Sequence, residues 1–288
     1  MVINFILFHK GNTLPLYIYD CIKQIHNTQS NYNLFLLTDA SPINIEGATL
    51  INLDNIWPLE LQDVCFYQSD SNPLWRTSFE RFFFIKNFIQ KNNIQNAIHF
   101  DNDVLIYKNV ADIINLLSLN IKNIGLTPHK IDELVCGFMY IKNFNSIELL
   151  CSKLLDLAKK GEKALEVELK SMPHEMRLLG NIWQENKDLI TMLPVLPFEP
   201  WNNQYNVLNG LFDPSSYGQF IGGTHANAGA DKLVVHPVNL SRIIDPYINN
   251  NIKVQFNHTT KKPYIMYDDF TIPLFNLHIH SKQLNLYI

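Results

Sequence analysis

Residues 97–107 read AIHFDNDVLIY, and this stretch decides the fold. The apolar runs before and after the acids predict two short buried strands. Asp101, Asn102 and Asp103 then fall at the carboxyl end of a buried strand, where open α/β sheets bind their ligands. A carboxylate taken out of water is costly unless a positive group meets it. We therefore expect Asp101 and Asp103 to hold a divalent cation, Mn²⁺ or Mg²⁺, that carries a diphosphate.

The same triplet is also an ordinary turn sequence, because Asp and Asn are common turn residues. The apolar runs on both sides favour the metal interpretation over a plain turn. An EF-hand calcium loop is excluded, since the required glycine and distal glutamate are missing.

The first hundred residues alternate strand and helix patterns. Strands are expected at 2–8, 32–39, 48–54 and 97–100, and helices at 14–28 and 78–93. The first helix carries a stripe of Leu16, Tyr19, Ile22 and Ile25, and Ser78 is the expected N-cap of the second helix. This β-α-β-β-α-β order predicts an α/β fold: a Rossmann-type, mostly parallel central sheet with helices on both faces.

The second half is less regular. Helices are expected at 109–119, 146–161 and 173–186, the last with Pro173 in its first turn. Strands are expected at 123–127, 133–143, 263–270 and 272–288. Residues 194–246 are rich in proline, glycine, asparagine and aromatic residues, which predicts irregular structure that forms part of a site. Trp201 in this segment is a candidate for contact with an acceptor substrate, because a large aromatic ring can stack on a ligand.

Composition limits the classes of function. A formal net charge of −4 over 288 residues argues against a nucleic-acid partner. Four scattered cysteines (Cys21, Cys65, Cys136 and Cys151) without C-x-x-C spacing predict free thiols in a reducing compartment. The sequence shows neither a signal-peptide pattern nor an apolar stretch of the roughly 20 residues that span a bilayer. We therefore expect a cytoplasmic protein without a transmembrane segment, with peripheral association at the inner face of a membrane left open.

The stretch NAIHFDNDVLIYKN (96–109) resembles the DxD motif of bacterial-type GT-A-fold nucleotide-sugar glycosyltransferases. Other segments resemble that family in the same order along the chain. They are YNLFLLTD (32–39), RTSFERFFFIKNFIQKN (76–92), CGFMYIKN (136–143) and PHEMRLLGNIW (173–183). The resemblance covers about residues 1–190 and implies a single GT-A-like domain, 1–288. In it, residues 1–107 form the nucleotide-binding part that ends in the DxD, and 108–288 form the part that binds sugar and acceptor.

The resemblance also implies roles for individual residues. Phe8, His9 and Asp39 would hold the nucleoside. Arg76 and Arg81 would contact phosphate or ribose, and Arg81, set among phenylalanines, has the more specific context. Asp101 and Asp103 would bind the metal, and Asn102 would join the donor-binding residues.

The stretch FNLHIHSK (275–282) follows near the end of the chain. In a strand, Asn276, His278, His280 and Lys282 would share one face, which suits either a solvated edge strand or a functional row. Some GT-A enzymes place a C-terminal histidine on the metal and a nearby lysine on the phosphate. We therefore expect His278 or His280 to complete the metal shell and Lys282 to neutralise the diphosphate.

Two further residues are candidates for catalysis. Glu175 lies in the first turn of a predicted helix. An acid there can stabilise the helix through its dipole, or it can serve as an active-site carboxylate near the acceptor. His225, in GQFIGGTHANAG (218–229), either faces the sugar cleft or is a structural histidine. H-E-x-x-H zinc-protease chemistry is excluded, because position 178 is leucine.

The predicted function is transfer of a sugar, as in hexosyltransferases, from a UDP-sugar to a hydroxyl of a glycan or glycolipid acceptor. Surface polysaccharide or lipopolysaccharide synthesis would fit such an enzyme. Two alternatives stay open: a haloacid-dehalogenase-type phosphatase that uses Asp101 and Asp103, with a second acidic pair at Asp268-Asp269, and an inactive protein that binds sugar nucleotides.

Overall fold

The computed structural model describes residues 2–40, 44–62, 64, 66, 73–221, 242–248 and 251–288. Its main helices are α1 (Leu16–Thr28), α2 (Pro73–Asn92), α3 (Ile114–Asn120), α4 (Phe144–Lys160), α5 (Glu162–Leu169), α6 (Glu175–Glu185), α7 (Tyr205–Leu208) and α8 (Tyr217–Phe220). Its strands are β1 (Ile3–His9), β2 (Tyr32–Thr38), β3 (Thr49–Asn52), β4 (Ala97–His99), β5 (Val104–Ile106), β6 (Ile124–Lys130), β7 (Glu133–Ile141), β8 (Ile190–Met192), β9 (Ile252–Asn257), β10 (Lys262–Tyr267), β11 (Phe270–Pro273) and β12 (Asn276–His278).

The central sheet has seven strands in the order β3-β2-β1-β4-β7-β6-β8. Its strands run parallel to one another, with β7 as the exception, because β7 pairs antiparallel with both β4 and β6. The predicted β-α-β-β-α-β order of the first hundred residues and the mostly parallel sheet are therefore confirmed. The carboxyl ends of β1 and β4 lie side by side, and the Asp-Asn-Asp triplet follows β4.

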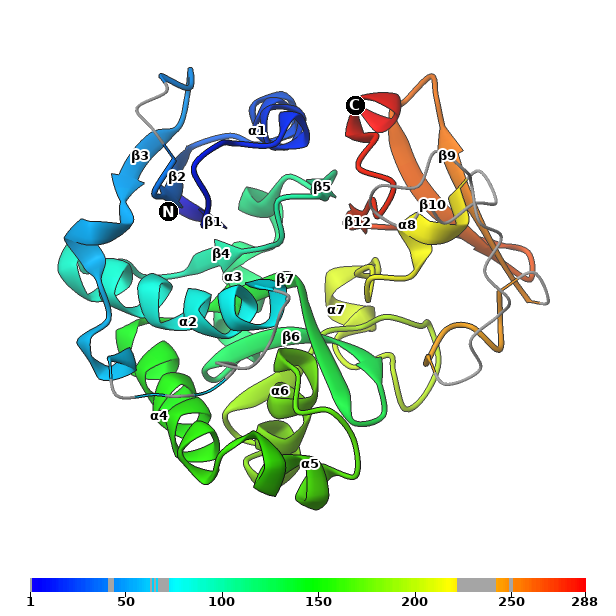
Figure 1. The fold of residues 1–288 in the computed structure, drawn as a ribbon. Coiled ribbons are helices and arrows are strands. Elements are labelled where there is room, and N and C mark those ends of the chain that lie inside the picture. The colour runs from blue at the N-terminus through cyan, green and yellow to red at the C-terminus, as the bar shows by residue number, and fades with distance from the viewer. Residues whose placement is uncertain are drawn as a thin grey trace.

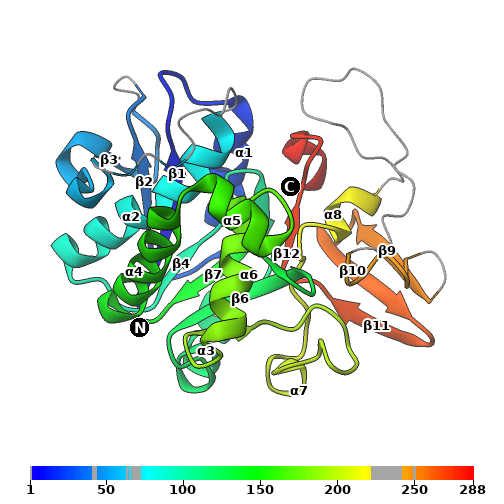
Figure 2. The same cartoon turned by 60° about the horizontal axis from the view of Figure 1, so that its bottom comes forward.

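Helices cover both faces of this sheet (Figure 1). Successive residues of β1 point to opposite faces, so Phe5 and Leu7 join one core cluster while Ile6 and Phe8 join the other. The second cluster takes its α-helical residues from α2, α4, α5 and α6, which lie together on one face (Figure 2). The first cluster takes them from α1 and α3 and continues into the C-terminal part of the chain.

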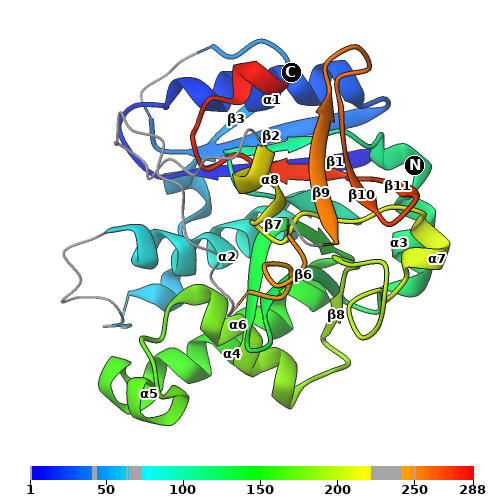
Figure 3. The ribbon, with the colours of Figure 1, turned by 90° about the vertical axis from the view of Figure 1, so that its right-hand side faces the viewer.

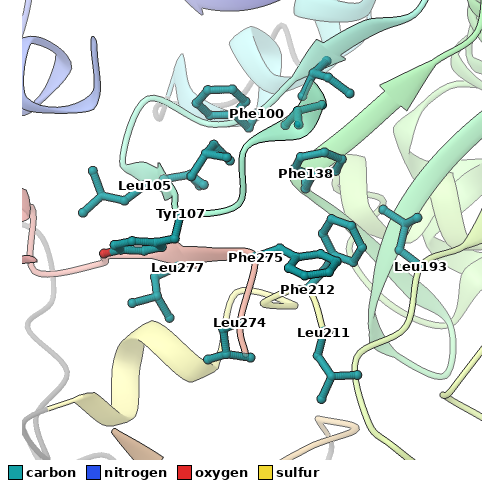
Figure 4. Packing of buried hydrophobic residues seen from close by; sticks show 14 of the residues in the cluster. Phe100, Leu105, Tyr107, Phe138, Leu193, Leu211, Phe212, Leu274, Phe275 and Leu277 are labelled. Carbon is teal, nitrogen blue, oxygen red and sulfur yellow. The ribbon is translucent and has the colours of Figure 1, made fainter. Parts of the chain in front are cut away.

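Two small sheets complete the fold. The antiparallel sheet β11-β10-β9 forms a separate layer (Figure 3), and β12 pairs antiparallel with β5. Aromatic rings fill the space where β12 returns to the central sheet. Phe212 lies between Phe138 and Phe275, with ring centroids 4.7 and 5.0 Å away (Figure 4). This packing joins the segment before β12 to β7 of the central sheet, and the pairing of β12 with β5 joins it to the strand that follows the Asp-Asn-Asp triplet.

Several local predictions are corrected. The second helix begins at Pro73, so Ser78 lies inside it and is not its N-cap. Leu16 and Tyr19 are exposed, since α1 buries the face that carries Ile18 and Cys21 with Ile22 and Ile25.

Three further boundaries also differ. The predicted helix at 109–119 is a 3₁₀ turn followed by α3, and α6 begins at Glu175, after Pro173. The helix predicted at 146–161 spans Phe144–Lys160, and a further helix, α5, follows Gly161 directly. The predicted strand at 272–288 is interrupted, because regular pairing ends at His278 and Lys282 has a positive φ of 61°.

Within the described ranges, the helices are all too short or too polar to cross a bilayer.

Candidate metal and donor site

A cleft of about 400 Å³ lies at the carboxyl ends of β1 and β4. Its walls come from the ends of these strands, the starts of α1, α2 and α6, and the segment after β12. Most of the predicted site residues line it: Phe8, His9, Arg81, Asp101, Asn102, Asp103, Glu175, His278, His280 and Lys282. The fold thus brings together residues that are up to 274 positions apart (282 − 8).

Two hydrogen bonds hold the turn that carries Asp101 and Asp103 at the edge of the cleft. The N–H of Val104 donates to the carbonyl of Asp101 at 3.0 Å, which closes a tight turn. The side-chain amide of Asn102 donates to the carbonyl of Phe8 at 2.7 Å and anchors the turn to the end of β1. Asn102 therefore has a structural task here, while the carboxylates on either side are left to face the cleft.

Arg81 organises one side of the cleft. Its guanidinium donates to Asp101 with one nitrogen and to Glu175 with another, and so joins α2, the turn after β4, and α6. Burial disfavours the charge of Arg81, but the two carboxylates outweigh burial and hold its pKa well above the ordinary value. Burial raises the pKa of the Glu175 carboxyl, and the neighbouring Arg81 opposes that rise. We call Arg81, Asp101 and Glu175 the Arg81 side.

Asp103 organises the other side. Its carboxylate accepts hydrogen bonds from Lys282 and from Nε2 of His278, the latter at 3.0 Å. Burial alone would raise the pKa of Asp103, but His278 and Lys282 outweigh burial and hold it well below the ordinary value. The pKa of His278 is raised: burial opposes its charge, and Asp103 outweighs burial. We call Asp103, His278 and Lys282 the His278 side.

Strand register explains why His278 meets Asp103. In the β12–β5 pair, His278 lies opposite Val104, the residue after Asp103. The pairing continues one step, since the N–H of Ile279 donates to the carbonyl of Asp103 at 2.8 Å. His278 is thereby fixed beside the acid by backbone hydrogen bonds from a segment 175 residues away.

Asp101, Asp103 and His278 could hold a metal ion. One ligand atom from each lies within 4.8 Å of those of the other two. Two carboxylates and one imidazole suit divalent cations that accept oxygen and nitrogen ligands, such as Mn²⁺. His278 and Lys282 hold the pKa of Asp103 below its ordinary value despite burial, so its carboxylate is ionised, which is the form that binds a metal. The residues present therefore fit a divalent cation.

His280 makes different contacts. Its Nε2 lies 2.8 Å from the hydroxyl of Ser215 and 3.1 Å from the amide nitrogen of Gln219. Its ring lies against the ring of His278, with centroids 4.4 Å apart and planes 37° apart. The group of candidate ligands therefore includes His278 and leaves out His280, a choice that the sequence had left open.

Two predicted residues, among those that the structure describes, do not line the cleft. Asp39 follows β2 and accepts from the N–H of Gly11 at 2.6 Å. Arg76 lies on the exposed part of α2 and pairs with Glu80 at 2.7 Å. His225 lies outside the described residues, so its role stays a prediction.

Sequence reasoning missed some lining residues. Tyr17 lies under Lys282, whose Nζ is 5.3 Å from the ring centroid. Trp75 stacks on His174 at 5.0 Å with planes 30° apart, beside Glu175. An aromatic residue at the first turn of each helix was the available signal, but aromatic residues more often serve packing.

Two other candidates lie elsewhere. Trp201 packs against the first core cluster and does not line the cleft, so its proximity to an acceptor is unsupported. Asp268 and Asp269 occupy the exposed turn between β10 and β11, and neither lines the cleft. The second acidic pair required by the phosphatase alternative is therefore absent from this cleft.

No protein-family model matches the sequence, and no curated protein matches it in a sequence search. Solved structures do match. Mouse xyloside xylosyltransferase 1 in its apo form is 12% identical, with 72% of this chain and 92% of that chain covered and a TM-score of 0.50. An active-site mutant of LgtC is 11% identical, with 96% and 86% covered and a TM-score of 0.47. The glycosyltransferase GlyE of Streptococcus pneumoniae is 16% identical, with 75% and 47% covered and a TM-score of 0.43.

Similarities at this identity concern the fold alone. The match to the mouse xylosyltransferase, together with the sheet order and the Asp-x-Asp turn after β4, confirms the predicted GT-A type of fold.

Proposed function

We propose that the protein is a metal-dependent glycosyltransferase that moves a sugar from a nucleotide diphosphate sugar to a hydroxyl group. One observation carries the proposal. Asp101, Asp103 and His278 converge within 4.8 Å at the carboxyl ends of parallel strands, and Lys282 meets the same carboxylate of Asp103. Such an edge is the usual ligand-binding place in open α/β sheets.

Asp101, Asp103 and His278 would hold the metal, Mn²⁺ or Mg²⁺; the imidazole ligand favours Mn²⁺. When bound, the cation would stabilise the negative charge that develops on the leaving diphosphate. Asp103 now has Lys282 as its cationic partner, and the Lys282 side chain is one-third exposed. With that carboxylate neutralised by the metal, the ammonium group of Lys282 would be available to phosphate oxygens.

The Arg81 side has a separate task. Arg81 is buried and holds Asp101 and Glu175 in fixed positions, so both acids reach the cleft already oriented. Asp101 would then share the metal, and Glu175 would face the transferred sugar or the acceptor hydroxyl. Whether Glu175 acts as a base is part of this proposal, as is a role for His225 in the sugar cleft.

The donor would be a UDP-sugar, and the reaction that of a hexosyltransferase. Phe8 and His9 line the cleft at the end of β1 and would contact the nucleoside. Asp39 and Arg76 would contribute from the ends of β2 and α2, and Asn102 would hold the turn beneath the donor. A glycan or glycolipid of a surface polysaccharide is the acceptor class that we propose.

The cytoplasm is the compartment that we propose, with peripheral contact to a membrane kept as part of that proposal. The support is the state of the cysteines: Cys21, Cys136 and Cys151 are free and buried. Free thiols persist in reducing compartments.

The test is turnover of a panel of UDP-sugars with Mn²⁺, measured as release of UDP with and without glycan acceptors. We expect turnover in the wild type and a loss of about 10³-fold in Asp103→Asn, because metal stabilisation contributes several kcal/mol. Asp188→Asn is the control, since Asp188 forms an exposed pair with Lys122 and should retain full activity.

Three results would overturn the proposal. UDP binding without transfer to any acceptor would identify an inactive binding protein. A phosphoenzyme trapped with a fluoride analogue would identify a phosphatase. Full activity in Asp103→Asn would remove the role of the metal.

A further inference from the structure

The segment DPSSYGQ (213–219) encloses His278. It begins with Asp213, which is fully buried and has no lysine or arginine partner in the described part of the chain. Oδ1 of Asp213 accepts the N–H groups of Ser216 and Tyr217 at 2.7 and 2.8 Å. Oδ2 accepts those of Gly218 and His278 at 2.9 and 2.8 Å. A buried carboxylate needs such donors, and one of the four belongs to the candidate metal ligand itself.

The backbone around His278 is held by further contacts. The N–H of Asp213 donates to the side-chain oxygen of Asn276 at 3.0 Å, and the amide of Asn276 donates to the carbonyl of Gly137 in β7 at 3.1 Å. Gly218 approaches so closely that a Cβ there would lie 2.2 Å from the carbonyl oxygen of His278. The main chain of His278 is therefore held between Asp213, which accepts its N–H, and Gly218, which contacts its carbonyl. Asn276 connects this region to the central sheet.

The imidazole ring of His278 is held by the same segment, through His280. Ser215 and Gln219 fix Nε2 of His280, and the His280 ring covers one face of the His278 ring at 4.4 Å. A ring covered on one face and carried by a fixed main chain has few orientations left. Nε2 of His278 then points to Asp103.

We infer that Asp213 above all, with Ser215, Gly218 and Gln219, positions His278 in the orientation needed to bind a divalent cation. This inference rests on the proposed function, because it assigns a task at the same metal site. Groups that orient a metal ligand without touching the metal typically change affinity by about 10- to 100-fold when they are altered.

The test measures Mn²⁺ affinity alone, by the electron paramagnetic resonance signal of free Mn²⁺, with no donor and no turnover. We expect Asp213→Asn to weaken Mn²⁺ binding by about 10- to 100-fold, because an amide cannot accept all four N–H groups. The matched control is Tyr217→Phe. It removes a buried hydrogen bond to the carbonyl of Val195 from the same segment, but nothing that touches His278. We expect the Mn²⁺ affinity of this variant to stay within about twofold of the wild type, while its melting temperature falls because a buried hydrogen bond is lost.

Gly218→Ala is the second variant, in case Asp213→Asn does not fold. It keeps every hydrogen-bonding group and adds only the methyl group that meets the His278 carbonyl. We expect weaker Mn²⁺ binding by about 10-fold in a protein that still unfolds cooperatively.

The outcomes separate the two proposals. Wild-type affinity for Mn²⁺ in both Asp213→Asn and Gly218→Ala would overturn the positioning role while leaving the metal site intact. Equal losses of Mn²⁺ affinity in Tyr217→Phe and Asp213→Asn would also overturn it. Loosening of the segment by any lost hydrogen bond would then be sufficient to weaken Mn²⁺ binding. A wild type that binds no Mn²⁺ would instead refute the proposed function.

Discussion

The two sides of the cleft hold buried acids in different ways. On the Arg81 side, one guanidinium within the fold pairs with both Asp101 and Glu175, and its side chain is only 9% exposed. On the His278 side, the cation on Asp103 is Lys282, whose side chain is 33% exposed. Both acids of the Arg81 side therefore share one buried cationic partner, whereas Asp103 is paired with the buried His278 and with Lys282 at the surface of the cleft.

This difference indicates a division of tasks. A buried arginine that pairs with two carboxylates is costly to disturb, which suits a structural role. An amine on a flexible side chain at the cleft surface can exchange its partner, which suits a group that moves to a ligand. Each experiment below tests one side against the other.

Arg81→Met should have the largest effect on stability. It leaves Asp101 and Glu175 without their cation, and loss of one partner of a buried pair costs about 3–5 kcal/mol. Urea unfolding would measure the change. Arg76→Met is the control on the same helix: its pair with Glu80 is half-exposed and should contribute less than about 1 kcal/mol. Equal losses of unfolding free energy in the two variants would contradict a structural role for the Arg81 side.

Lys282→Met should mainly affect transfer. We expect kcat/KM to fall by about 10²- to 10³-fold, because the variant lacks the donor that we propose for the leaving diphosphate. Stability should fall without metal and recover in saturating Mn²⁺, since the cation then neutralises Asp103. The measurements are UDP release and thermal unfolding with and without Mn²⁺, and Lys160→Met, at an exposed pair with Glu168, is the control. The same loss of stability with and without Mn²⁺ would contradict the exchange of partners.

The two histidines should differ in metal affinity. His278→Ala removes a proposed ligand and should weaken Mn²⁺ binding by about 100-fold or more. His280→Ala removes only the ring that supports His278 and should weaken binding by about 10-fold. Calorimetric titration with Mn²⁺ would rank them. The reverse order would assign the metal to His280.

Acid should loosen the His278 side. His129 in β6 anchors the 213–219 segment, because its Nδ1 donates to the carbonyl of Pro214 at 2.8 Å. Burial lowers the pKa of His129 to about 4, and nearby Arg242 and Lys130 act in the same direction while Glu133 opposes them. An unfolded histidine titrates near pH 6.5.

Between about pH 6.5 and 4, therefore, the unfolded chain binds a proton at this position that the folded chain does not. This contribution to stability is present above pH 6.5 and falls by about 1.4 kcal/mol for each pH unit as the pH decreases towards 4. Urea unfolding at pH 7 and pH 5 would measure it. His129→Gln keeps a donor for Pro214 and should reduce the difference in stability between the two pH values; an unchanged difference would refute this role of His129.

The placement of Asp101 and Glu175 at the cleft was largely predictable from the sequence, but their pairing with Arg81 was not, because the sequence pointed to phosphate or ribose as the partner of Arg81. Strand periodicity around residues 97–107 placed Asp101 at the right edge of the sheet, and Arg81 was notable because phenylalanines surround it. The helix that begins at Glu175 was recognised within two residues, and that acid faces the cleft. These features follow from local periodicity and from the rules of parallel sheets.

The His278 side was predictable only in part. The row of His278, His280 and Lys282 was visible, but the choice between the histidines depends on the register of β12 against β5, which no local pattern sets. Asp213 gave no signal at all: a single acid in an irregular loop looks like a turn residue until its four N–H donors are seen. The roles of Asp39, Arg76 and His225 stay predictions.

The β12–β5 pair has a consequence for how the protein is made. A ribosome releases Asp101 and Asp103 long before it releases the segment that carries His278 and Lys282. A nascent chain that has not reached residue 282 can assemble the strands that bear the acids, yet it lacks both the histidine and the lysine that face them. The candidate metal site, as proposed here, is therefore incomplete until translation has passed residue 282.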